Sequence, residues 1–418
     1  MKKSLFRALP YLVIFGLPVA FSCSTKSDSP TGGNTGASGS TATGGAGGDA
    51  LGGTSSLGGM TGSVAGGGGD MTAGGGGATG GAAGAMAGGA GGATGGAGGA
   101  TGGTGGVADG PATLFDTGLY ADAAMTQLAA GVMEYTPQFV LWSDGADKKR
   151  YMLLPPGTMI DTTDMDHWKY PVGTKVWKEF TSQNKRIETR LLWKKDDTTW
   201  FMGSYAWSED LTMATLVPKK GQMDALGTTH DIPSTHDCGN CHQGQKDKVL
   251  GFTAIQLSHD GSVTNLKTLK MANLLSAPPT EDAFVVPGTA QEKAVLGLFH
   301  ANCGTCHNPD GAGYDRNPTM RMLLLVGQLG SVQQTDAYAT TVGVANFQDL
   351  TTLNGFAGIT QRIEPGHPEQ SAVYLRMHQR DPEQLISMPP IGTEEVDTTG
   401  SQLISDWITA LPPVADAG

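Results

Sequence analysis

The chain has 418 residues, a formal net charge of −12 at pH 7 and a sequence pI of about 5.1. An acidic chain without a basic patch argues against nucleic acid as a partner, and it docks more readily on neutral or basic proteins than on acidic ones. Only five cysteines occur, so a disulfide-rich scaffold is not expected.

The first 22 residues are typical of an export signal. Met1–Lys3 and Arg7 form a basic start, and an apolar run from Tyr11 to Phe21 precedes Cys23. The run is too short for a membrane span. The cysteine resembles the lipidated cysteine of bacterial lipoproteins, which implies lipidation at Cys23 and a membrane attachment through that lipid. We expect an exported, cell-envelope protein, an outer-membrane lipoprotein facing the periplasm or the cell surface; a plainly cleaved secretory signal is the alternative.

Residues 23–110 are expected to form a disordered tether behind this lipid. Residues 29–110 consist almost entirely of Gly, Ala, Thr and Ser and contain no aromatic residue. Such a segment cannot bury enough apolar surface to offset its backbone entropy. A G-x-G-x-x-G match at Gly75–Gly80 follows no predicted strand and opens no helix, so a nucleotide-binding loop is rejected.

Residues 111–286 predict a β-rich domain. Six of the seven tryptophans lie between Trp142 and Trp207. Thr174–Phe180 alternates between apolar and polar side chains as a strand does. Ile187–Lys194 and Thr199–Trp207 are separated by a short polar turn and predict a hairpin. We expect an antiparallel, sandwich-like sheet of about 100 residues.

The stretch Val140–Arg150 allows two interpretations. As a ligand or partner loop, it would use Trp142 as a stacking face and Lys148 to Arg150 as donors. As a structural element, it would be a tight turn at Asp144–Gly145 with a solvated basic end. We favour the turn, since tryptophans near sheets more often belong to a core than to a site.

Two short motifs carry the chemistry. Cys238–His242 and Cys303–His307 each place two thiols three residues apart with a histidine directly after the second. This arrangement attaches a c-type haem, with the histidine as proximal iron ligand. Nine histidines occur among 418 residues, so a histidine at both places arises by chance about once in 2,000 random placements. We predict two covalent haem c groups, held by Cys238, Cys241, Cys303 and Cys306 and ligated by His242 and His307.

The two pairs also allow other chemistry. Together they could form a four-thiolate zinc site, and each alone could be a thiol redox pair. Zinc ribbons do not require the histidines, and neither pair follows a clear thioredoxin-like strand. With Cys23 lipidated and four thiols on haem, no cysteine is left for a disulfide. Haem attachment takes place outside the bacterial cytoplasm, which agrees with an export signal.

Residues 287–418 predict an all-α domain, so that the whole chain is of the α+β class. Glu292–His300 has a helical pattern that leads into Cys303. Ser401–Leu411 is predicted to be the last helix, ended by Pro412, and we expect Trp407 on it to pack at the edge of a haem pocket. Its apolar face comprises Leu403, Ile404, Trp407, Ile408 and Leu411.

Ordered short motifs between Tyr135 and Leu275 resemble a bacterial family of exported dihaem c-type cytochromes. The motifs are Trp142-Ser-Asp-Gly-Ala, Leu154-Pro-Pro-Gly, Pro171-Val-Gly-Thr, Glu188-Thr-Arg, Ile232-Pro-Ser before the first haem motif and Leu250-Gly-Phe after it. The resemblance implies a β-rich domain fused to the first haem and a role in electron transfer.

Gly288–Pro412 resembles the single-haem cytochrome c domain, in which a methionine just before prolines supplies the sixth iron ligand. Met388 precedes two prolines ahead of the last helix, so the resemblance implies Met388 as the ligand opposite His307. The alternatives His367 and His378 have the surroundings of solvated residues.

These features together predict a dihaem cytochrome that passes single electrons between extracytoplasmic redox partners. No sixth ligand is evident for the first haem, so a dihaem peroxidase or haem oxidoreductase with an open first haem is the second hypothesis. A Trp-rich binding module with accessory haems is the third. The residues near His242 in sequence that could serve as the sixth ligand of this iron are His230, His236, His259, Met223 and Met271.

Overall fold

A computed structural model describes residues 110–261, 264–380 and 386–413. The predicted signal, the lipidation site Cys23 and the tether up to residue 109 lie outside the described residues. Within the ranges that are described, no helix has the length and apolar character needed to cross a membrane.

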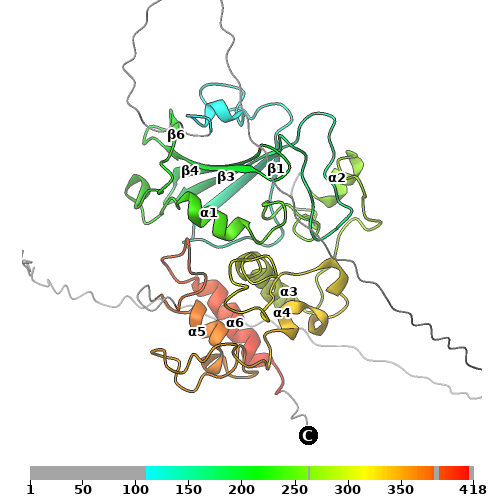
Figure 1. Cartoon of the computed structure of the whole chain (residues 1–418), viewed down its shortest axis with the longest axis vertical. Coiled ribbons are helices and arrows are strands. Elements are labelled where there is room, and N and C mark those ends of the chain that lie inside the picture. The colour runs from blue at the N-terminus through cyan, green and yellow to red at the C-terminus, as the bar shows by residue number, and fades with distance from the viewer. Residues whose placement is uncertain (1–109, 262–263, 381–385, 414–418) are drawn as a thin grey trace, which may run out of the picture. The chain divides into compact units, whose positions relative to one another are not determined.

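One antiparallel sheet of six strands forms the first part of the described chain, and each strand pairs with the next in sequence (Figure 1). The predicted strand and hairpin are confirmed as β3, β4 and β5. The described residues contain this one sheet and not the two sheets of a sandwich, because loops and helices cover its faces. The strands are β1 (Met133–Tyr135), β2 (Asp147–Leu153), β3 (Lys175–Ser182), β4 (Lys185–Lys194), β5 (Trp200–Trp207) and β6 (Ala214–Leu216).

One face of the sheet is an aromatic core. Strand alternation places Tyr151, Trp177 and Tyr205 on this face, where they are 0–5% exposed. Leu114 and Leu119, in the segment before β1, cover them (cyan in Figure 1). Each of these aromatic rings buries a large apolar area, which stabilises this core.

The opposite face is divided between apolar and cationic residues. At one end, Met152 packs with Phe252 and other buried residues of the chain beyond the sheet. At the other end, Lys148 and Arg150 of β2 face inward, and Arg150 is only 5% exposed. The expectation of a solvated basic end is therefore wrong for these two residues, because strand alternation turns only Lys149 toward solvent. The predicted turn is confirmed, since Asp144 and Gly145 both have positive φ, 45° and 64°.

Short helices follow the sheet. Three of them begin with a capping box, in which a polar side chain and the third residue after it satisfy each other's backbone N–H groups. The helices are α1 (Thr235–His242), α2 (Leu266–Met271), α3 (Ala290–Leu298), α4 (Asp336–Ala339), α5 (Ala372–Met377) and α6 (Thr398–Ala410). Single 3₁₀ turns occupy Phe115–Thr117, Ala225–Gly227, Val326–Gln328, Val332–Gln334 and Pro368–Gln370.

The helices α3 and α6 pack on each other around a buried apolar core. Both predicted helices are confirmed, although α3 continues into a π-helical turn over Phe299–Cys303. Trp407 lies edge-on to Phe299 at 5.9 Å and to Tyr338 at 6.3 Å, so it packs inside this core. Its place at the edge of a haem pocket stays a prediction. Further core residues include Val295, Leu296, Ile404 and Ile408.

Long-range hydrogen bonds join the sheet loops to the helical part. Asn302 Oδ1 accepts the backbone N–H of Trp142 at 2.7 Å. Asp166 Oδ1 accepts the N–H of Val326 at 2.7 Å. These bonds fasten the loops at Trp142 and Asp166 to Asn302, directly before the second Cys-x-x-Cys-His motif, and to Val326 after it.

Candidate functional site

The first haem motif forms the second half of α1. Ser234 and Asp237 cap the start of this helix, and residues three and four apart on a helix lie on one side of it. Cys238, Cys241 and His242 therefore project toward the same side, and all three are half-buried. The two thiols are free. The local geometry suits the attachment of one planar group to both thiols.

The imidazole of His242 is oriented by the loop that follows. Its Nδ1 lies 2.6 Å from the carbonyl oxygen of Lys248, so Nδ1 carries the proton and donates it. Burial lowers the pKa of His242 to about 4, which keeps the ring neutral. A neutral ring whose Nδ1–H is occupied by a carbonyl presents the lone pair of Nε2, as a metal-ligating histidine does.

Asp247 fixes that loop to the sheet. Its buried carboxylate accepts Lys194 Nζ of β4 at 2.7 Å, Trp200 Nε1 of β5 at 3.0 Å and the backbone N–H of Tyr170 at 2.6 Å. The next residue is Lys248, whose carbonyl oxygen accepts the Nδ1–H of His242. Sequence reasoning missed Asp247, because nothing in its local pattern distinguishes it from a surface carboxylate.

The second motif follows the π-helical turn at the end of α3. His307 N–H and Cys306 N–H both donate to the carbonyl of Cys303, at 2.9 and 3.1 Å, which closes the motif into a compact turn. Burial and the nearby positive charges of Arg376 and Arg362 lower the pKa of His307 to about 4. Its buried Nδ1 has no hydrogen-bond partner in the described part of the chain.

Met388 lies beside the second motif. Met388 and Cys303 line one pocket of roughly 300 Å³, open solvent included, together with Trp142, Leu298, Asn302, Met377, Arg380, Pro389 and Asp397. The backbone N–H of Met388 donates to Arg376 O at 2.7 Å, which ties this loop to α5. The alternatives His367 and His378 are exposed.

The two motifs touch each other. The thiols of Cys241 and Cys306 interact, and this interaction raises the pKa of Cys241 and lowers the pKa of Cys306. Gly244 also packs on the second motif: a β carbon at this position would lie 1.9 Å from the carbonyl oxygen of Thr305. Only glycine permits this approach. All four predicted thiols and both histidines are thus gathered in one region, as the sequence could not show.

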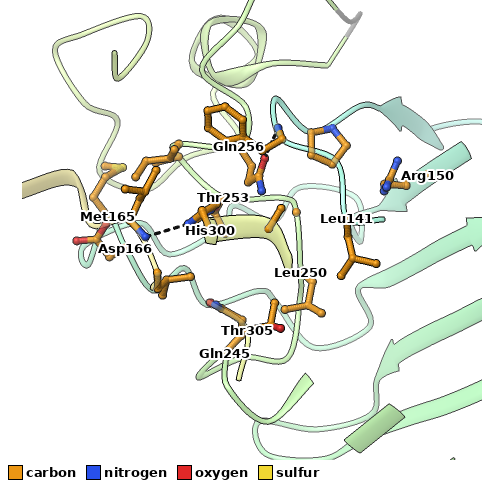
Figure 2. A pocket seen from close by; sticks show the side chains of 18 of the residues that line it. Leu141, Arg150, Met165, Asp166, Gln245, Leu250, Thr253, Gln256, His300 and Thr305 are labelled. Carbon is orange, nitrogen blue, oxygen red and sulfur yellow. Dashed lines mark hydrogen bonds between the residues drawn. The ribbon is translucent and has the colours of Figure 1, made fainter. Parts of the chain in front are cut away.

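A larger pocket lies between the motifs and the cationic end of the sheet. Together with the open solvent at its mouth it measures roughly 690 Å³. Figure 2 shows Arg150 on a strand at one end, Asp166 at the other and His300 between them. Gln245 after the first motif and Thr305 inside the second also line it.

His300 is the histidine of this pocket, and sequence reasoning missed it. Its Nδ1 accepts the backbone N–H of Leu324 at 3.0 Å, so the neutral ring carries its proton on Nε2. The five candidates near His242 in sequence do not line the pocket. His230 is bonded to Glu188, and Met223 and Met271 are 68% and 75% exposed.

Across the described ranges, no three His, Cys, Asp or Glu side chains gather closely enough to hold a metal ion. A four-thiolate zinc site would need such a group, whereas a porphyrin brings its own nitrogen ligands and needs one or two from the protein. No protein-family model, curated protein or solved structure matches this chain.

Proposed function

We propose that this chain is a dihaem c-type cytochrome that passes single electrons between extracytoplasmic redox partners. The observation that carries the proposal is the pair of Cys-x-x-Cys-His motifs in mutual contact, each with free thiols and a neutral, half-buried histidine. Neutral imidazole is the form that binds iron. The acidic chain suits neutral or basic redox partners.

The residues present fit two haems. Cys238 and Cys241 would hold the first porphyrin, with His242 as its iron ligand. Cys303 and Cys306 would hold the second, with His307 and Met388 as its ligands. Bound haem supplies a one-electron iron couple, and a methionine opposite a histidine raises its reduction potential. The second motif also contains a buried polar atom without a partner among the described residues, His307 Nδ1, as expected where a further polar group belongs.

The protein's own part in this function is to orient ligands, exclude water and bring the two haems together. Lys248 O holds His242 in one tautomer, and the bond from Met388 N–H to Arg376 O positions the methionine loop. The interaction between Cys241 and Cys306 supports two attachment points that would lie side by side. Electrons entering at one haem would therefore pass to the other within the same chain.

The domain organisation belongs to the same proposal. Residues 1–22 would direct export, Cys23 would carry the lipid, and residues 23–110 would tether the redox part to the cell envelope. Residues 111–286 would form the domain of the first haem, and residues 287–418 a cytochrome c domain. The tether gives a membrane-held electron carrier the reach to meet its partners.

An oxidoreductase with an open first haem is the second candidate. The large pocket beside the first motif and the Nε2–H of His300 favour it, because an open haem needs space and a hydrogen-bond donor on its free side. A Trp-rich binding module has less support. Trp168, Trp177 and Trp207 are at most 3% exposed, and Trp142 lines the pocket of Met388.

The test is a carbon monoxide difference spectrum of the reduced, haem-matured chain, together with haem per chain. Two haems without a carbon monoxide shift are expected for a six-coordinate electron carrier. Two haems of which one shifts would favour the open-haem oxidoreductase. A chain that carries no haem after maturation would contradict the proposal and favour a zinc site or thiol redox chemistry. The variant Cys303→Ala with Cys306→Ala, which keeps only the first motif, is the control for assigning each haem.

A further inference from the structure

Four cations line up across one face of the sheet. Lys148 and Arg150 lie on β2, Lys178 on β3 and Arg190 on β4; we call these four residues the cationic cluster. In the strand register, Arg150 pairs with Lys178, and Lys178 pairs with Arg190. Strand alternation points all four side chains to the same face. The cluster spans two inter-strand spacings of about 4.8 Å each.

The cluster has too few counter-charges. Glu188 accepts Arg190 Nε at 2.9 Å and is shared with His230. In the part of the chain that is described, no carboxylate lies within 4.0 Å of Lys148, Arg150 or Lys178. Lys148 and Arg150 instead donate to the carbonyls of Ala146 and Lys148, at 2.7 and 3.3 Å.

The aromatic ring of Phe180, on the same face of the sheet, makes cation–π contacts with three of the four residues. Phe180 lies 5.1 Å from Lys178 Nζ, 5.8 Å from Lys148 Nζ and 4.1 Å from the guanidinium carbon of Arg190. A ring face offsets only part of what burial costs a cation. Burial, together with the neighbouring charges of the cluster, lowers the pKa of Lys178 well below its ordinary value and that of Lys148 to about 8.

The cluster lies beside the first haem motif. Arg190 acts electrostatically on both Cys238 and Cys241, and Lys178 acts on Cys241. Arg150 and Lys178 line the large pocket. Gln245 and Leu250, which follow the motif, line it as well (Figure 2). Any group attached to these two thiols would therefore extend into the field of the cluster.

We propose that the cationic cluster binds the propionate carboxylates of the porphyrin attached to Cys238 and Cys241. This inference rests on the proposed function. The vinyl edge of the porphyrin would be fixed at the two thiols, and the opposite edge carries two carboxylates. Arginine forks and lysine ammonium groups are the usual partners of such carboxylates. The porphyrin thereby supplies the anions that the cluster lacks.

The cluster also sets the reduction potential of the first haem. Positive charges near the porphyrin favour the ferrous state, which carries one negative charge more than the ferric state. Removing a cation from the cluster should therefore lower the potential of the first haem and leave the second unchanged.

The experiment compares haem-matured full-length chains by haem content and by spectroelectrochemical titration of each haem. Lys178→Met and, independently, Arg150→Gln should lower one midpoint potential by about 59 mV, a tenfold change in a one-electron equilibrium constant. Lys178→Arg should restore the wild-type value. The matched control is Lys149→Gln, the exposed neighbour on the other face of β2, which should change nothing. Met388→Ala identifies which potential belongs to the second haem.

Two haems per chain with unchanged potentials in both charge-removing variants would overturn the inference and leave the dihaem assignment standing. An equal fall in both potentials would also overturn it, since the effect would not be local to the first haem. A wild-type chain without haem would remove the proposed function itself. These failures are distinguished by the haem content of the wild-type chain.

Discussion

Two neighbouring residues of the loop after α1, Asp247 and Lys248, give His242 a single orientation. Lys248 O accepts from its Nδ1, and Asp247 fastens the loop to β4 and β5 through a buried ion pair and an indole N–H. Asp247 and Lys194 are 7% and 5% exposed, so their charges are compensated mainly by each other. Breaking one partner of such a pair leaves the other charge buried and alone.

The variant Asp247→Asn should therefore be less stable by about 3 kcal/mol, because Lys194 loses its counter-charge. Urea unfolding of the matured chain measures this. The spectrum of the first haem should also broaden, since the His242 ligand is no longer held in one orientation. Asp164→Asn, at a half-exposed carboxylate, is the control and should stay within about 0.5 kcal/mol. Equal stabilities of the two variants would contradict the anchoring role.

Glu188 leads to a pH-dependent prediction at the same scale. Burial alone would raise its pKa, but Arg190 and His230 lower it below the ordinary value. A carboxyl whose pKa is lowered on folding adds stability above its unfolded pKa, and this stability is lost as pH falls through the folded pKa. Glu188→Gln should cost about 3 kcal/mol at pH 7, and this difference from wild type should shrink below about pH 4.5.

Urea unfolding at a series of pH values from 7 to 3 would reveal this convergence. The exposed Glu209→Gln serves as the control and should follow the wild type throughout. A Glu188→Gln penalty that stays constant over the whole range would show that packing, and not charge, is what the variant removes.

At the scale of elements, a glycine allows the backbone after helix α1 to approach the turn of the second motif closely. Gly244 follows α1 and approaches the Thr305 carbonyl more closely than any β carbon allows. On the sheet, strand alternation turns Lys148 and Arg150 toward the interior and Lys149 toward solvent. Both effects depend on backbone geometry and not on side-chain type alone.

The variant Gly244→Ala should destabilise the chain by about 1–3 kcal/mol, because the new methyl group collides with a backbone oxygen. Thermal unfolding of the matured chain gives the measurement. Gly239→Ala, inside α1 with open space around its position, is the matched control and should be neutral or slightly stabilising. A Gly244→Ala variant as stable as Gly239→Ala would contradict the contact between the motifs.

At the scale of the whole molecule, the second site is assembled from distant parts of the chain. Cys303 and Met388 share a pocket with Trp142, which comes from the loop before β2. The bond from Trp142 N–H to Asn302 fixes that loop against the motif. The loop that sequence reasoning treated as a simple turn therefore also closes the candidate second haem site.

The variant Met388→Ala should open the sixth position of the second iron. We expect the reduced protein to bind carbon monoxide at one haem and the midpoint potential of that haem to fall, since the thioether that favours ferrous iron is gone. Spectra and redox titration measure both effects. Met213→Ala, at a half-exposed methionine, should bind no carbon monoxide. An unchanged spectrum in Met388→Ala would assign the sixth ligand elsewhere.

The sequence by itself determined those features that depend on a few neighbouring residues. Alternation predicted β3, β4 and β5, and helical spacing predicted α3 and α6, because each signal is contained in a few neighbouring residues. The two five-residue motifs are equally local, and haem attachment at their thiols stays a prediction.

Only the tertiary structure decided which distant groups meet. Loop closure decides that Cys241 meets Cys306 and that Met388 lies beside Cys303. Strand register decides that the four residues of the cationic cluster lie next to one another on one face. These pairings are set by packing over the whole chain, so no local pattern records them.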